Sequence, residues 1–127
     1  MSFRWLAPYS WEFITAQNAA LCAAKNAKHG PTSDGHKAAR KMWSAKFAGE
    51  LSLAEAVELC RKCHQLAPFL FYNGNTFAAV IRDVIQQLPM PKVEKAVARS
   101  LAGHIVAGVA SNEETDEFRK ACERYGF

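Results

Sequence analysis

The chain has 127 residues, half of them apolar and 22% charged, a composition typical of a soluble globular protein. This length supports one domain, residues 1–127, whose core needs neither a disulfide nor a metal to fold. No apolar run approaches the roughly 18–20 residues that cross a bilayer, and no signal-like stretch opens the chain, so we expect a cytoplasmic protein without a membrane partner.

Six segments have the residue spacing of amphipathic helices, with helix-start and helix-stop residues between them. They run from about 11–28, 33–48, 52–67, 75–88, 91–109 and 111–125. Capping-box patterns, Ser52 to Glu55 and Ser111 to Glu114, open the third and the sixth segments. No segment shows a sustained β-type alternation. The sequence therefore predicts an all-α, single-domain bundle of about six helices.

Apolar residues at helical spacing predict the buried face of each helix. In the second segment this face carries Ala38, Met42, Ala45 and either Phe47 or Ala48. In the third segment it carries Leu53, Ala56, Val57, Cys60, Cys63 and Ala67. The fourth segment has Asn75 or Thr76 as its expected N-cap and buries Phe77, Val80, Ile81, Val84 and Leu88. The fifth is rich in Ala and Gly, which allow close approach, so we expect it to be the central helix.

Residues 60–64, Cys-Arg-Lys-Cys-His, match C-x-x-C-H, the pattern to which c-type haem is attached. Met90, between two prolines, and His104 are the candidates for the second axial ligand beside His64, and the setting of Met90 is the more typical of a ligand loop. However, Cys60, Cys63 and His64 fall on one apolar helical face, as small core thiols do. Haem attachment also requires export, and no second Cys/His pair has the spacing of a zinc site. We therefore favour core cysteines without a cofactor, with an electron-transfer cytochrome as the alternative.

Positive charge is concentrated in the first part of the chain. Residues 1–50 carry seven Lys or Arg against three Asp or Glu, whereas residues 51–127 carry nine of each. The second predicted helix contains Lys37, Arg40, Lys41 and Lys46. Such a basic patch suits an acidic protein surface or nucleic acid. Because no nucleic-acid-binding motif accompanies the charge, an acidic protein is the expected partner.

An aromatic stretch, residues 68–72, leads through Asn73-Gly74-Asn75 into the fourth predicted helix. Backbone N–H groups at a helix N-terminus, next to a turn glycine, are suited to bind an anion. Phe69, Phe71 and the Asn-Gly-Asn turn are therefore candidate residues for binding a partner or an anion. A capped helix with a buried aromatic lead-in is the alternative interpretation.

The same residues resemble the motif H-x-F-x-[DN]-[GA]-N-[GK]-R of the Fic/Doc family, which consists of small all-helical proteins. Phe71 and residues 73–75 match this short motif. Phe69 stands at the position of the catalytic His, and Phe77 and Val80 stand at the positions of two arginines. The resemblance therefore implies a degenerate member that has lost nucleotide transfer.

These patterns together predict a small non-catalytic interaction or regulatory protein. It binds an acidic protein, or nucleic acid, through the basic helix and the aromatic loop. Two alternatives remain: a c-type haem electron carrier, and a degenerate Fic/Doc-like nucleotide or phosphate transferase.

Overall fold

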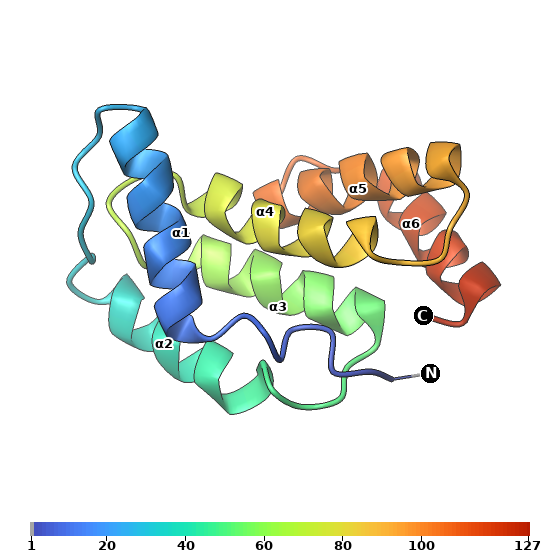
Figure 1. Cartoon of the computed structure of the whole chain (residues 1–127), viewed down its shortest axis with the longest axis horizontal. Coiled ribbons are helices and arrows are strands. Elements are labelled where there is room, and N and C mark those ends of the chain that lie inside the picture. Colours follow the sequence, from blue (N-terminus) through green and yellow to red (C-terminus); the bar gives the residue numbers. More distant parts are fainter. Residues whose placement is uncertain (1) are drawn as a thin grey trace.

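The computed structural model describes residues 2–127 and contains six helices (Figure 1). They are α1 Trp11–Ala24, α2 Gly35–Lys46, α3 Leu53–Gln65, α4 Asn73–Gln86, α5 Lys92–Ala107 and α6 Asn112–Tyr125. Within the described residues, β pairing is limited to two isolated bridges, Phe3 with Leu51 and Pro31 with Phe69. The predicted all-α bundle of six helices is therefore confirmed.

Helices α2 to α5 lie roughly side by side, and α1 crosses one end of this group at a steep angle (Figure 1). α3 packs against α2, α4, α5 and α6, whereas α1 contacts α2 and α4. The C-terminal end of α3 and the N-terminal ends of α2 and α4 meet at the left end of Figure 1, next to the loop between α1 and α2. None of the helices in residues 2–127 is both long enough and apolar enough to cross a membrane.

The interior is formed mainly by α3, α4 and α5, which contain six, seven and five buried residues. The small-residue helix α5 contacts α3, α4 and α6, and its buried face includes Ala98, Ala102 and Gly103. α4 is nevertheless more completely buried, since seven of its residues are buried against five in α5. The large side chains of α4 fill the core, whereas the small ones of α5 let its neighbours approach.

The buried face of α2 differs from the predicted one. Ala38 and Ala45 are exposed, so their predicted burial is wrong, and Met42 is only partly buried. Ala39 and Trp43 face the core instead, both with 0% exposure. A buried tryptophan removes far more apolar surface from water than two alanines do, so Trp43 sets the rotation of this helix.

Several predicted helix ends are also wrong. α1 ends at Ala24 and not at residue 28. α4 does not begin after Asn75 or Thr76, but at Asn73, with Tyr72 in the N-cap position. Thr76 instead lies in the first turn, buried, where its hydroxyl donates to the Tyr72 carbonyl oxygen at 2.7 Å. At the end of α3, Ala67 lies beyond the helix, exposed and in the left-handed region with φ 47°.

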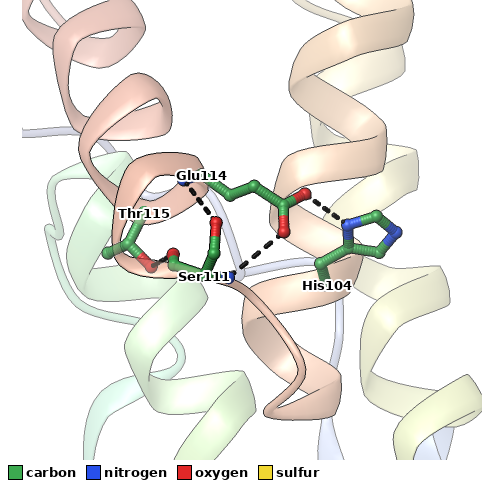
Figure 2. A network of polar contacts seen from close by, with 4 residues as sticks. All are labelled: His104, Ser111, Glu114 and Thr115. Atoms are coloured by element: carbon green, nitrogen blue, oxygen red, sulfur yellow. Dashed lines mark hydrogen bonds and ion pairs between the residues drawn. The ribbon is translucent and has the colours of Figure 1, made fainter.

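Both predicted capping boxes are present, and the one on α6 also ties α6 to α5 (Figure 2). The Ser111 hydroxyl accepts a hydrogen bond from the Glu114 amide at 3.1 Å, and Glu114 Oε1 accepts one from the Ser111 amide at 3.1 Å. The other oxygen of Glu114 lies 2.7 Å from Nδ1 of His104, in the last turn of α5. The Glu114 carboxylate thus accepts from the Ser111 amide at the start of α6 and at the same time links α6 to α5.

Candidate partner-binding surface

Phe69 anchors the segment that joins α3 to α4. Its ring is 2% exposed and stacks on Trp11, with 5.7 Å between ring centroids and 15° between ring planes. The rings of His29 and His36 lie against it, with centroids at 5.9 and 5.8 Å. Burial and the nearby Arg40 lower the pKa of His36, so its ring is neutral at neutral pH. Phe69 therefore supports the surface from below and does not itself face solvent.

Asn73 braces the same segment through its side-chain amide. Its Oδ1 accepts from the Phe69 amide at 2.9 Å, and its Nδ2 donates to the Phe69 carbonyl oxygen at 2.8 Å. Tyr72, between them, has the left-handed backbone conformation that turns the chain into α4. With both ends of the loop fixed, Leu70 and Phe71 project outward and are 42% and 50% exposed.

A buried polar network holds the loop from the side of α1. Asn18 is 0% exposed, and its Nδ2 donates to the Phe71 carbonyl oxygen at 2.8 Å and to the Thr76 hydroxyl oxygen at 3.0 Å. Its Oδ1 lies 2.8 Å from Nδ1 of His29 and accepts a weak hydrogen bond from the Cys22 thiol at 3.6 Å. Both polar atoms of the Asn18 side chain therefore have hydrogen-bond partners. Because these bonds form only when the Phe71 carbonyl oxygen is in place, they favour a single position of the loop.

The N-terminal end of α2 is held directly against this loop. A Cβ at Gly35 would lie 2.6 Å from the carbonyl oxygen of Ala67 and closer still to that of Leu66, so only glycine fits there. The Thr32 amide donates to the Pro68 carbonyl oxygen at 3.0 Å, and the Thr32 hydroxyl donates to that of Ala67 at 2.6 Å. The beginning of the predicted basic helix and the aromatic loop are thus neighbours.

Five exposed cations lie between the end of α1 and the middle of α2. They are Lys25, Lys28, Lys37, Arg40 and Lys41. Asp34 is the only carboxylate in residues 25–41, and within the described chain none of these cations forms an ion pair. Their charges are therefore available to a partner.

Lys46 does not belong to this group. It lies about two and a half helical turns after Lys37 and therefore on the opposite side of α2. There it lines a groove between α2 and α3 together with Glu55 and Glu58. All four basic residues predicted on this helix are exposed, but Lys46 lies on a different side of it from the other three, beside carboxylates.

The Asn73-Gly74-Asn75 turn forms the first turn of α4. Asn73 is engaged with the Phe69 backbone, and Asn75 is exposed. The His64 ring lies against Gly74, with its Nε2 3.3 Å from the place where a Cβ would be. His64 Nδ1 lies 2.7 Å from the Val106 carbonyl oxygen, so Nδ1 carries the proton and donates to the end of α5.

The cysteines of the C-x-x-C-H pattern lie in the core. Cys60 and Cys63 are both 0% exposed, and all four cysteines are free thiols. Burial raises the pKa of Cys60 well above its usual range and that of Cys63 to about 12. Both thiols are therefore protonated at neutral pH, which makes them poor nucleophiles.

Met90 and His64 are held far apart. His64, a residue of α3, has its ring against Gly74 at the start of α4. Met90 follows the other end of α4 and is partly buried against the core. A helix of 14 residues spans about 20 Å. In this fold the two side chains therefore cannot ligate one iron atom from its two faces.

The positions at which the Fic/Doc resemblance expects catalytic side chains are in the core. Phe69, at the position of the catalytic His, is 2% exposed, and Phe77 and Val80, at the positions of the arginines, are 0% and 1% exposed. None of the three faces solvent, so none can contact a nucleotide.

A hollow of about 540 Å³ lies between the N-terminal segment and α4, lined by Trp5, Tyr9 and Phe13 on one side and by Asp83 and Gln87 on the other. The Tyr9 hydroxyl donates to the Asp83 carboxylate. Burial, reinforced by this hydrogen bond, raises the pKa of Tyr9 and keeps it protonated. The contact links the N-terminal segment to α4.

Sequence reasoning missed Asn18, which supports the loop, and Leu70, which is exposed on it. A single polar residue on an apolar helix face, as Asn18 is between Ile14 and Cys22, was the available signal. Among residues 2–127, no three His, Cys, Asp or Glu side chains group closely enough to hold a metal ion. No protein-family model, curated protein or solved structure matches this chain.

Proposed function

We propose that this chain is a non-catalytic binding protein whose partner is an acidic protein segment. The binding surface consists of Leu70 and Phe71, which supply apolar contacts, and of the exposed cations of residues 25–41. Four buried free thiols are consistent with a reducing compartment, so the proposal includes a cytoplasmic location.

The observation that carries this proposal is the exposure of Leu70 and Phe71 on a loop that is otherwise fixed. Half-exposed large apolar side chains that stand on a rigid support lose little conformational entropy on binding. Such residues, particularly aromatic ones, commonly dominate the binding energy of an interface. Here the support is formed by buried Phe69, by the amide of Asn73 and by the Asn18 network.

The charges around these two residues define the chemistry of the partner. Lys37, Arg40 and Lys41 lie at helical spacing on the exposed side of α2, and Lys25 and Lys28 follow α1. A partner segment that places an apolar side chain against Phe71 and carboxylates on either side satisfies both features. Leu70 offers an aliphatic surface, which suits a protein segment better than the stacked bases of a single-stranded nucleic acid.

Fluorescence anisotropy with labelled probes tests this proposal. The probes are a peptide that alternates Glu with Leu and Phe, the same peptide with Lys in place of Glu, and a single-stranded oligonucleotide. We expect the acidic peptide to bind best, with an affinity that falls as salt is raised. If the oligonucleotide bound more tightly than the acidic peptide, the proposed protein partner would be wrong and nucleic acid would be the partner class.

Variants assign the binding to this surface. Phe71→Ala should weaken binding of the acidic peptide about tenfold or more, which corresponds to about 1.4 kcal/mol of binding free energy. Lys37→Glu should also weaken binding of this peptide, and its effect should be largest at low salt. The matched controls are Val93→Ala and Lys92→Glu, which alter an exposed Val and an exposed Lys at the start of α5. Equal effects of test and control variants would contradict the proposed surface.

A further inference from the structure

We infer that the groove between α4 and α5 is a binding site for a phosphate-type oxyanion, held by Arg82 and Arg99. The groove has a volume of about 420 Å³ and is lined by Ala79, Arg82, Asp83, Gln86 and Arg99. It lies along the middle and the C-terminal half of α4, away from Phe71, and the inference does not depend on the proposed function.

Gly103 determines where the Arg82 guanidinium lies. A Cβ at this position would be 2.9 Å from both Cζ and Nε of Arg82, so the guanidinium rests directly on the backbone of α5. Arg99 precedes Gly103 by one helical turn on the same helix. The lack of a side chain at Gly103 thus lets two guanidinium groups from different helices lie beside one groove.

The charge of this arginine pair is not compensated within the described chain. Neither Arg82 nor Arg99 forms an ion pair there, whereas Arg61, Arg119 and Arg124 all do. Moreover, Nε of Arg99 is buried without a hydrogen-bond partner. A buried donor without a partner costs free energy, and so do two neighbouring like charges.

The remaining polar groups leave the positive charge in excess. Asp83, at the edge of the groove, already accepts hydrogen bonds from the Tyr9 hydroxyl and, at 3.3 Å, from Gln87. Lys95, one turn before Arg99 on α5, donates to the Gln86 carbonyl oxygen at 2.9 Å and adds a third positive charge. Two guanidinium groups therefore line the groove, Lys95 lies beside it, and the one carboxylate in its lining already accepts two hydrogen bonds through Oδ2.

An oxyanion with several acceptor oxygens would compensate the positive charge of this pair. Guanidinium groups bind phosphate oxygens through paired, charge-assisted hydrogen bonds. The groove is open to solvent along the helices, so a phosphoryl group attached to a larger molecule fits as well as free phosphate. The ligand class is thus a phosphate dianion, either free or as a phosphomonoester.

Nuclear magnetic resonance of the arginine side chains tests the site in the unmodified protein. Sodium phosphate, or AMP as a phosphomonoester, is titrated at constant ionic strength while the Nε–Hε signals are followed. We expect saturable shifts at Arg82 and Arg99 and none at Arg119, which is paired with two carboxylates. Similar affinities would indicate recognition of the phosphoryl group alone, and tighter binding of AMP would indicate the phosphomonoester.

Variants provide the second readout. Arg99→Gln should weaken the binding at least tenfold, and Gly103→Ala should do the same by displacing Arg82, whereas Arg119→Gln should leave it unchanged. The absence of saturable shifts with both ligands would overturn the inference. So would equal shifts at Arg119, or unchanged affinity in folded Arg99→Gln. If a variant fails to fold, the shifts in the unmodified protein decide the matter alone.

Discussion

Replacing Asn18 by alanine should destabilise the protein strongly and specifically at the proposed binding surface. Asn18 is fully buried in α1 and hydrogen-bonds the Phe71 carbonyl oxygen, the Thr76 hydroxyl and the His29 ring. Alanine removes these interactions, together with the weak hydrogen bond from the Cys22 thiol, and leaves a small cavity. The Phe71 carbonyl oxygen then has no partner from α1.

The magnitude follows from these interactions. Each lost hydrogen bond contributes a net of about 0.5–1.5 kcal/mol, and an unsatisfied buried group costs about 1–3 kcal/mol. Because Thr76 keeps its bond to the Tyr72 carbonyl oxygen, the total loss in unfolding free energy should be about 2–4 kcal/mol. For a domain of this size that corresponds to a fall in melting temperature on the order of 10 °C.

Urea unfolding followed by circular dichroism measures this loss. Asn75→Ala is the matched control, because Asn75 is exposed in the first turn of α4 and its replacement should change the unfolding free energy by no more than about 0.5 kcal/mol. If Asn18→Ala were as mild as the control, the buried network would not hold the loop in solution.

Three further substitutions test other parts of the structure. In urea unfolding, Gly35→Ala should cost more than about 2 kcal/mol through a backbone clash, whereas Gly49→Ala, with its nearest contact at 3.5 Å, should be almost neutral. Ala67→Gly should stabilise by about 1 kcal/mol by relieving the left-handed backbone, whereas Ala38→Gly on exposed α2 should destabilise by a similar amount. The hydrogen bond from His104, and then the Ser111 amide, lower the pKa of Glu114 below its ordinary 4.5. The contribution of the ionised Glu114 to the free energy of unfolding is therefore present above pH 4.5 and is lost as the pH falls through the lower folded pKa. The unfolding curves of the wild type and Glu114→Gln should therefore converge in acid.

The helical architecture could be predicted because its signals are local. Ser52 and Ser111 mark helix starts through neighbours three residues away, and both capping boxes are present. The apolar face of α4 was equally predictable, since it repeats at helical spacing. The rotation of α2 was not, because it depends on how Trp43 fits among residues of other helices. The spacing of residues within one helix does not contain this information about packing between helices.

The candidate surface was predictable only in part, for the same reason. The aromatic loop and the basic segment are each visible in the sequence, but their contact depends on the backbone approach of Gly35 to residues 66 and 67. The role of Phe69 as a buried anchor, in contrast to exposed Phe71, follows from packing against Trp11. Nor does sequence spacing connect Arg82 to Gly103, which meet across two helices.

Positive backbone φ angles occur at the loop end of the molecule, where we propose the binding surface. Among residues 2–127, three residues other than glycine have positive φ: Asn26, Ala67 and Tyr72. They follow α1, follow α3 and precede α4, so they shape the loops that carry Lys25, Lys28 and Phe71. Left-handed conformations cost about 1–2 kcal/mol for residues such as Ala and Tyr, and such strain clusters at binding and catalytic sites. Glycine would have relieved this strain at Ala67 and Tyr72, but it would have left the loop more flexible in the unbound protein. A loop that presents Phe71 in one fixed position is what a binding surface with a low entropic cost requires.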